Sequence, residues 1–430
     1  MTGAEELLAR ARQLDADDPL APLRARFALP RADGGDTLAY FCGHSLGPLC
    51  DGVRAILDEE LATWAARAVE GHFDGPRPWF SYHEQFAAPL ARLAGARPVE
   101  VVAMGSLTTN LHLLCASFYR PTATRYRIVI ERAAFPSDLY AMHSQAAFHG
   151  FDPERAVIEI GPREGEHAIR HEDVERVLDE HGDEIALVLW PGVQYVTGQA
   201  FDLGRLARAA HDAGAVFGAD LAHAIGNVPL RLHDDGVDFA VWCSYKYLNA
   251  GPGAIGGAFV HERHARRDDL PRLAGWWGHD PETRFAMDRA RRFVPQPGAA
   301  GWQLSNPPVL AAAPLLASLA LFDEAGEERR LAKARAQFAL LVDVLDAAPG
   351  DRLEVITPRG DGAHGCQVSV RLPGRAERIA RALRRDGFVV DVRPPDVIRV
   401  APVPLFNTHE EVARLGLRLV ELAGGADGTC

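Results

Sequence analysis

The chain has 430 residues, and 46 Lys and Arg residues against 58 Asp and Glu residues give it a net charge of −12 at pH 7. This acidic balance argues against a nucleic-acid or anionic-membrane partner, because binding to polyphosphate requires a basic face. Hydrophobic residues make up 47% and charged residues 24% of the chain, as in ordinary globular proteins, which excludes disorder as its main state. Only Lys246 and Lys333 supply lysine amines, so covalent amine chemistry has two candidates.

Residues 1–50 are predicted to form an N-terminal arm, in which a helix leads to a strand and a glycine-bounded turn within LAYFCGHSLGPL. The beginning of the chain lacks the apolar segment of a secretory signal and carries glutamates, unlike a transit peptide. No apolar run approaches the roughly 20 residues of a membrane helix. The six cysteines form no CxxC pair, so we expect neither a disulfide framework nor a zinc ribbon, and a cytoplasmic location.

A mainly parallel α/β domain is predicted for residues 51–310. From about residue 99 to 260, short runs rich in Val and Ile alternate with segments that have helical spacing. Because the strand segments are almost continuously apolar, we expect a sheet that helices cover on both faces. The predicted strands lie within residues 125–132, 155–160, 184–190, 215–220, 238–244 and 254–260, and the predicted helices within 137–148, 171–181 and 202–214.

The stretch from Asp268 to Pro308 breaks this rhythm with proline, glycine and three tryptophans, which predicts a long irregular connection of the kind that usually has a function. Beyond it, residues 311–430 are predicted to form a smaller α+β domain. Its expected helices lie within residues 307–326, 327–348 and 377–387, with a last one from Thr408, and its expected strands within 366–372, 388–393 and 397–402.

A carboxylate and an amine follow two neighbouring predicted strands. Asp220 ends one strand, His223 lies three residues further on, and Lys246 follows the next apolar run. In parallel sheets ligands sit at the carboxyl ends of strands, so we expect Asp220 and Lys246 in one crevice. Pyridoxal phosphate chemistry needs such a pair: an amine for the Schiff base, and a buried carboxylate that keeps the pyridine nitrogen protonated. The alternative is a turn-capping Asp220 and a surface Lys246, which the rarity of lysine and the apolar and aromatic neighbours of Lys246 disfavour.

Two further segments fit a cofactor of this kind. The strand, turn and helix of EVVAMGSLTTNLHLLCASF offer backbone N–H groups and the hydroxyls of Ser106, Thr108 and Thr109 to a phosphate, although an ordinary helix cap has the same pattern. The segment ERAAFPSDLYAMHS places Phe135 and Asp138 directly after a strand. An aromatic side chain there could stack on a flat ring, although a lone Phe is more often part of a core.

Six motifs are distributed along the chain: AFPSDLYA, GVQYVTGQAFDL, GADLAHAIGNVPL, WCSYKYLNAGPGAIGG, AGWWGHD and SNPP. Together with GCQVSV and IRVAPVPLFNT, they resemble the sequence of kynureninases from about Tyr40 to about Asn407. The resemblance implies a homodimeric pyridoxal phosphate enzyme of fold type I, in the class-V aminotransferase superfamily, with a mainly parallel seven-stranded sheet in its large domain. It implies hydrolysis of L-kynurenine or 3-hydroxy-L-kynurenine to an anthranilate and L-alanine.

The resemblance also implies roles for single residues. Lys246 would be the Schiff-base lysine and remove the Cα proton, Asp220 would pair with the pyridine nitrogen, and Tyr245 would contact the phosphate and relay a proton. Further implied cofactor contacts are Leu107, Thr108, Phe135, Asp138 and His223, with Trp276 and Asn306 reaching the cofactor of the neighbouring subunit. The implied substrate contacts are His72, Ser305, Asn306 and Arg399, of which Arg399 would clamp the α-carboxylate.

Two positions depart from the family pattern. The early turn reads CGHSLG where GNSLG is expected, so His44 replaces an amide. Pro191 stands where some members have a hydroxyl residue near the phosphate, and proline donates no hydrogen bond. The alternative functions are another class-V-type enzyme, either an aminotransferase or a desulfurase with Cys366 as nucleophile, and a non-catalytic scaffold. Because Cys366 begins an apolar strand, a core thiol is favoured.

Three weaker signals favour structural roles. The GxGxxG match at Gly251–Gly256 precedes a predicted strand rather than a helix, so it indicates close backbone packing beside Lys246 and not a dinucleotide site. His261 and His264 in HERH have a metal-like spacing without an evident third ligand, which favours a solvated helix end. Lys333 lies in a charge-rich amphipathic segment and is predicted to be a surface residue.

Overall fold

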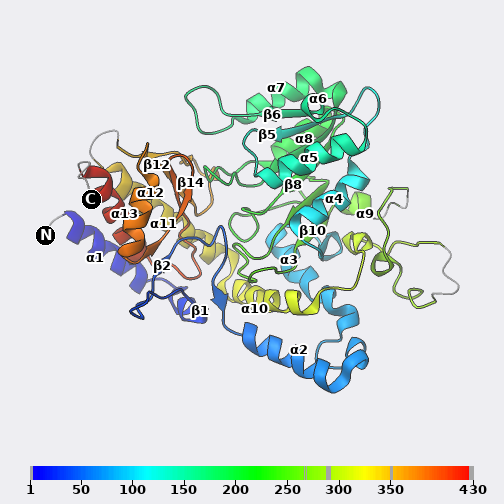
Figure 1. Ribbon diagram of the computed structural model, residues 1–430, viewed down its shortest axis with the longest axis horizontal. Coiled ribbons are helices and arrows are strands. Elements are labelled where there is room, and N and C mark those ends of the chain that lie inside the picture. The colour runs from blue at the N-terminus through cyan, green and yellow to red at the C-terminus, as the bar shows by residue number, and fades with distance from the viewer. Residues whose placement is uncertain (1–2, 266, 268, 287–291, 349–351, 426–430) are drawn as a thin grey trace.

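A seven-stranded sheet forms the centre of the larger part of the molecule (Figure 1). The computed structural model describes residues 3–265, 267, 269–286, 292–348 and 352–425. The strands follow the order β4-β10-β9-β8-β7-β5-β6, and β10 runs antiparallel to its neighbours β4 and β9 while the other pairs are parallel. This confirms the predicted mainly parallel sheet. The bounds are β4 Val101–Ala103, β5 Arg127–Glu131, β6 Val157–Ile160, β7 Ile185–Pro191, β8 Val216–Asp220, β9 Phe239–Trp242 and β10 Gly257–Val260.

Helices cover both faces of the sheet because its strands send alternate side chains into two cores. On β7, Val188 and Trp190 pack into the core that α7 and α8 close, whereas Leu187 and Leu189 pack into the core that α4 and α5 close. The near-continuous apolar runs of the sequence are therefore strands buried on both sides. The helix bounds are α3 Ala87–Ala94, α4 Leu107–Phe118, α5 Pro136–Phe148, α6 Pro153–Ala156, α7 His171–His181, α8 Leu203–Asp212 and α9 Glu262–Ala265.

The C-terminal part contains an antiparallel four-stranded sheet of order β11-β12-β15-β14. Its last helix starts as predicted, because the Thr408 side chain accepts a hydrogen bond from the Glu411 amide (3.1 Å) and Glu411 caps in return. The bounds are α11 Glu327–Asp346, β11 Glu354–Val355, β12 Val368–Arg371, α12 Ala376–Arg385, β14 Asp391–Arg393, β15 Val397–Val400 and α13 His409–Gly424.

The N-terminal arm lies against this C-terminal part. Helix α1 (Gly3–Ala16) packs along α13, and β2 (Ala39–Tyr40) pairs in parallel with β13 (Phe388–Val389) (Figure 1). The domain limits of 1–50, 51–310 and 311–430 stay a prediction. The remaining elements are η1 Ala21–Arg26, β1 Phe27–Ala28, β3 Leu49–Cys50, α2 Val53–Arg67, η2 Ala68–His72, η3 Trp79–Phe86, η4 Pro98–Glu100, η5 Gly182–Glu184, η6 Trp276–Gly278, η7 Ala299–Trp302 and α10 Val309–Ala325.

The long connection before α10 is irregular, as predicted. Its described residues hold only the short turns η6 and η7 and a bridge between His279 and Pro295, and Asp268 lies outside the described residues. Among the helices that the structure describes, none alone is long and apolar enough to cross a bilayer; α10 and α11 meet that criterion only when taken together, across a bend of 82°.

Lys333 is buried, so the prediction of a surface residue is wrong. Its Nζ lies 2.7 Å from Asp18 Oδ2, and the two side chains are only 6% and 4% exposed. Asp18 belongs to the N-terminal arm, which covers this part of α11. The helical pattern of α11 places Lys333 among charged residues, which predicts exposure. It contains no information about the N-terminal arm, which covers Lys333 in the folded chain.

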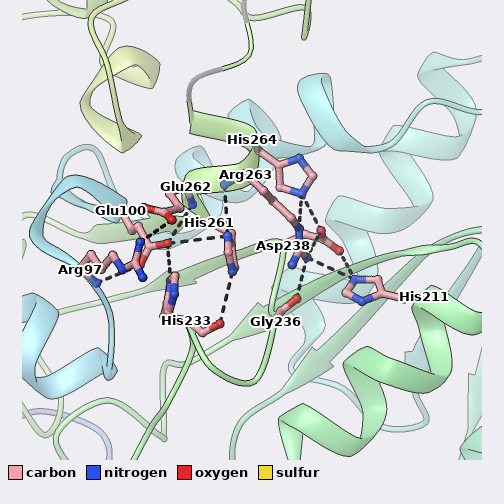
Figure 2. A network of polar contacts seen from close by, with 10 residues as sticks. All are labelled: Arg97, Glu100, His211, His233, Gly236, Asp238, His261, Glu262, Arg263 and His264. Atoms are coloured by element: carbon pink, nitrogen blue, oxygen red, sulfur yellow. Dashed lines mark hydrogen bonds and ion pairs between the residues drawn. The ribbon is translucent and has the colours of Figure 1, made fainter.

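His261 and His264 are also more buried than a solvated helix end, with side chains 12% and 15% exposed. Figure 2 shows them in two carboxylate-centred networks that join η4, α9 and the start of β9. His264 lies 2.6 Å from Asp238 Oδ1. Glu100, which is fully buried, accepts from His233 Nδ1 at 2.8 Å and has His261 Nδ1 at 3.7 Å. The two histidines therefore tie the end of the sheet to the loops around it.

Glu100, His233 and His261 lie close enough together to be considered as metal ligands. The orientation of the two histidine rings argues against a metal site, because His233 and His261 stack with centroids 4.8 Å apart and planes only 24° from parallel. Imidazole ligands direct a lone pair in the plane of the ring, so two stacked rings do not point at one tetrahedral ion. Glu100 Oε1 already accepts from the Glu262 amide at 2.8 Å. The group is best described as a hydrogen-bonded joint.

We expect Asp238→Asn to lower the free energy of unfolding by about 3 kcal/mol at pH 7, because it breaks a buried charge cluster. Burial alone would raise the pKa of Asp238, but hydrogen bonds from His211, His264 and Arg263 hold that pKa well below its usual range. A carboxyl group whose pKa is lower in the folded than in the unfolded state stabilises the protein fully above its unfolded pKa of about 4. This contribution is lost as the pH falls toward the folded-state pKa. Urea unfolding from pH 7 to 3 tests this: the advantage of the wild type over the variant should be constant down to about pH 4 and then shrink by up to about 1.4 kcal/mol per pH unit.

Candidate active site

One cavity lies at the carboxyl ends of the central strands. It is bounded by the ends of β5, β7 and β8, the turn after β9, and the first turns of α4 and α5, which is where parallel sheets place ligands. Eight of the residues predicted for the site meet there. The lining residues are Leu107, Thr108, Glu131, Phe135, Ser137, Asp138, Pro191, Val193, Tyr195, Asp220, Ala222, His223, Tyr245 and Lys246.

Lys246 lies in the tight turn that follows β9, with its Nζ 5.6 Å from the centre of the Phe135 ring. The predicted turn of the N-terminal arm holds this segment, because the Gly47 amide donates to the Tyr245 carbonyl at 2.8 Å. A Cβ on Gly47 would come within 2.6 Å of the Lys246 carbonyl oxygen, so glycine is required for this approach. The residues flanking Lys246 are thus fixed by backbone contacts from a distant part of the chain.

Three carboxyl groups face the same cavity. Asp220, at the end of β8, is 9% exposed and accepts from the Ala222 amide at 2.6 Å. Burial, followed by the neighbouring Asp220, raises the pKa of Asp138 well above its usual range. Asp138 therefore stays protonated, and its O–H donates a hydrogen bond to Asp220. Burial and the charge of Asp220 likewise raise the pKa of Glu131. Two of the three carboxyl groups, Glu131 and Asp138, are therefore shifted toward the neutral form beside Asp220.

The first turn of α4 forms the other end of the cavity. Ser106 is its N-cap, and the hydroxyl of Thr108 lies 2.8 Å from that of Ser137 in the first turn of α5. The N–H groups of the first turn of α4 thus lie together with hydroxyls from both helices, a combination that binds phosphate. A Cβ on Gly256 would lie 3.0 Å from the Ser106 backbone, and the Gly256 amide donates to the Gly105 carbonyl at 2.8 Å. The GxGxxG segment is therefore close backbone packing, as predicted.

The cavity fits the ring of pyridoxal phosphate. Glu131 Oε2, Asp138 Oδ1 and His223 Nδ1 are buried without a hydrogen-bond partner among the described residues. Burial and the charge of Lys246 lower the pKa of His223, so that ring is neutral and can accept or donate. Phe135, 44% exposed, offers a face for stacking. A planar heterocycle with a protonated nitrogen and a phosphate matches these unpartnered atoms and the Asp220 side chain in the same lining.

Five predicted site residues lie outside the cavity lining of this single chain. Trp276, 41% exposed, packs edge-on against Phe285, and Ser305 and Asn306 are also exposed. His72 is partly exposed, with its ring 5.4 Å from that of Trp79. The fifth, Arg399, is 1% exposed and lies behind Tyr195. Their roles stay predictions.

Sequence reasoning gave no role to Glu131 and Tyr195, although both line the cavity. Glu131 ends a predicted strand at the same edge as Asp220, and that position was the available signal. Cys366 proves to be a core thiol: it is 2% exposed, and burial raises its pKa to about 12. The cysteines that the structure describes, Cys42, Cys50, Cys115, Cys243 and Cys366, are all free and buried, and Cys430 lies outside the described residues.

Comparison with solved structures defines the fold. The fold matches the apo cysteine desulfurase of Thermococcus onnurineus NA1 with a TM-score of 0.73 and 19% identity, over 90% of this chain and 95% of that one. It matches C-DES, in a form with glycine covalently linked to the PLP cofactor, with a TM-score of 0.74 and 16% identity, over 93% and 99%. At these identities the likeness concerns the fold, which is the predicted α/β fold of this group of proteins.

Sequence relatives define the family. The chain is 53% identical over 412 residues to the kynureninase of Xanthomonas euvesicatoria, covering 95% of this chain and 96% of the relative. It is 50% identical over 404 residues to the kynureninase of Myxococcus xanthus, covering 94% of each. Residues 331–419 match the model of the kynureninase C-terminal domain. The chain belongs to the kynureninase family.

Proposed function

We propose that this chain is a pyridoxal phosphate-dependent hydrolase that cleaves the Cβ–Cγ bond of L-kynurenine or 3-hydroxy-L-kynurenine. One water is consumed, and the products are an anthranilate and L-alanine. The observation that carries the proposal is the joining of Lys246, Tyr245 and Asp220 in one cavity of a kynureninase-family chain.

The proposed roles follow from the position of each group. When bound, pyridoxal phosphate supplies an aldehyde that condenses with the substrate amine and a ring that accepts the electrons released at Cα. Lys246 would take up the Cα proton on Nζ, and the Asp220 side chain would hold a proton on the ring nitrogen. The first turn of α4, with Leu107 and Thr108, holds the phosphate.

Tyr245 is the proposed proton donor for the bond cleavage. Burial and the neighbouring Cys243 raise the pKa of its hydroxyl, so it stays protonated at neutral pH. It can therefore donate to the γ-carbonyl oxygen as water adds to the γ-carbon, which prepares the Cβ–Cγ bond for cleavage.

To test the proposal, the purified protein is loaded with pyridoxal phosphate and given each of the two kynurenines. Chromatography should detect equimolar aromatic acid and alanine. Failure to release either product from both substrates contradicts the proposal. A desulfurase would instead release sulfur from cysteine and lose turnover in Cys366→Ala; the burial of Cys366 outside the cavity argues against it.

We propose further that the protein is a homodimer with shared sites. Phe73, Trp276 and Phe285 form an aromatic patch, 58%, 41% and 48% exposed, with ring centres about 6 Å apart. An exposed apolar patch of this kind typically marks an interface. Asn306, which is predicted together with Trp276 to reach the site of the neighbouring subunit, is exposed and follows Leu304, whose carbonyl accepts from the Trp277 amide at 3.4 Å. The cysteines within residues 3–425 that the structure describes are buried and free, which supports the predicted cytoplasmic location.

Subunit mixing tests the shared sites. Chains with Lys246→Ala and chains with Asn306→Ala should each be nearly inactive, whereas subunit exchange between them should restore about a quarter of the wild-type activity, because half of the dimers are mixed and each holds one intact site. Light scattering during chromatography should give the mass of two chains. Activity that never exceeds the sum of the two separate variants would contradict a shared site.

A further inference from the structure

Arg399 belongs to a charge cluster directly behind Tyr195, one wall of the cavity. Its Nη1 donates to the Tyr195 carbonyl at 2.6 Å. Its Nε donates to Asp391 Oδ2 at 2.7 Å, and its Nη2 contacts the same oxygen. His44 Nε2 lies 3.3 Å from Asp391 Oδ2. Arg399, which is 1% exposed, is therefore held on two sides by groups of the protein itself.

Distant segments of the chain build this cluster. Asp391 and Arg399 face each other as cross-strand partners on β14 and β15, so the register of the small sheet fixes the pair. His44 comes from the turn of the N-terminal arm whose Gly47 amide holds the Tyr245 carbonyl. One turn therefore contacts both the lysine segment and the carboxylate that holds Arg399.

The charges of the cluster do not cancel. Arg393 Nε also lies 3.3 Å from Asp391 Oδ2, so one carboxylate faces two guanidinium groups. Burial, then the charge of Arg399, lowers the pKa of His44 to about 4, so this fully buried ring is neutral and donates from Nε2. One net positive charge remains beside the cavity, and such a charge is stabilised by an anion. Arg399 has five N–H groups, and the contacts above use three of them.

We propose that His44 and Asp391 are positioning residues, which hold Arg399 in the rotamer from which its two unused N–H groups bind the α-carboxylate of the amino-acid substrate. The inference rests on the proposed function, because an amino acid supplies that carboxylate. Asp391 occupies Nε and one N–H of Nη2, and Tyr195 one N–H of Nη1, which leaves one N–H on each Nη for a second carboxylate. His44 adds a neutral donor that helps to fix the orientation of the Asp391 side chain, which is 22% exposed and whose Oδ2 both guanidinium groups also contact.

Three variants test the roles of these residues. Asp391→Asn and His44→Phe should raise the KM for kynurenine about tenfold to a hundredfold, the range expected for losing a hydrogen bond to a charged group, with kcat changed less than about threefold. His44→Asn is the matched control, because its amide can still donate to Asp391. Its KM should stay within about threefold of the wild type.

A pair of ligands reports the carboxylate contact separately from turnover. L-alanine carries the α-carboxylate and ethylamine is the same amine without it, and both can be titrated against the absorption band of the cofactor-loaded protein. Asp391→Asn and His44→Phe should weaken alanine binding and leave ethylamine binding unchanged. Equal weakening of both ligands, a fall in kcat at constant KM, or a loss in His44→Asn as large as in His44→Phe would each overturn the inference. If the wild type hydrolysed neither kynurenine, the proposed function would fail while the ligand pair still tested the cluster.

Discussion

Lys246→Ala is expected to lower kcat/KM for kynurenine by more than about 10⁴-fold, because it removes both the amine that binds the cofactor and the base that accepts the Cα proton. The visible absorption band of the cofactor-loaded protein should disappear with it. The rate is measured from the fluorescence of the anthranilate product, and the band from absorption spectra taken during titration with pyridoxal phosphate. Circular dichroism should show an unchanged fold.

The matched control for this experiment is Lys333→Arg. Arginine keeps the charge that pairs with Asp18, so the fold and the absorption band should both persist. If the band survived in Lys246→Ala, or vanished in Lys333→Arg while the protein stayed folded, Lys246 would not be the amine that binds the cofactor.

Lys333→Met is expected to lower the free energy of unfolding by about 3 to 5 kcal/mol, because it leaves the Asp18 carboxylate buried without its partner. The cofactor band and kcat of the folded variant should stay close to those of the wild type, since Lys333 does not line the cavity. Urea unfolding followed by tryptophan fluorescence measures the change.

The double variant Lys333→Met with Asp18→Leu separates the loss of the ion pair from the loss of packing. Replacing a buried ion pair by apolar side chains is often neutral, so most of the lost stability should return. A double variant no more stable than Lys333→Met would mean that the cost arises from packing alone. A single variant as stable as the wild type would contradict the burial of the pair.

The sequence predicted the part of the site that follows strand ends. Asp220 and Lys246 come after consecutive apolar runs, and parallel strands bring their carboxyl ends to one edge, so local pattern and one rule of topology were sufficient. The first turns of α4 and α5 joined them because each helix also starts at that edge. Glu131 could have been found by the same reasoning.

The sequence by itself determined the parallel sheet, the irregular connection and the two candidate lysines, because alternation, helical spacing and residue type are properties of short segments. Only the tertiary structure decided which lysine is buried in an ion pair and that His264 hydrogen-bonds to Asp238. It also decided that Arg399 lies behind Tyr195, in contact with Asp391, which His44 contacts in turn. Each of these depends on a segment hundreds of residues away or on the register between strands. Local periodicity shows which face of a segment is covered, and the fold decides what covers it.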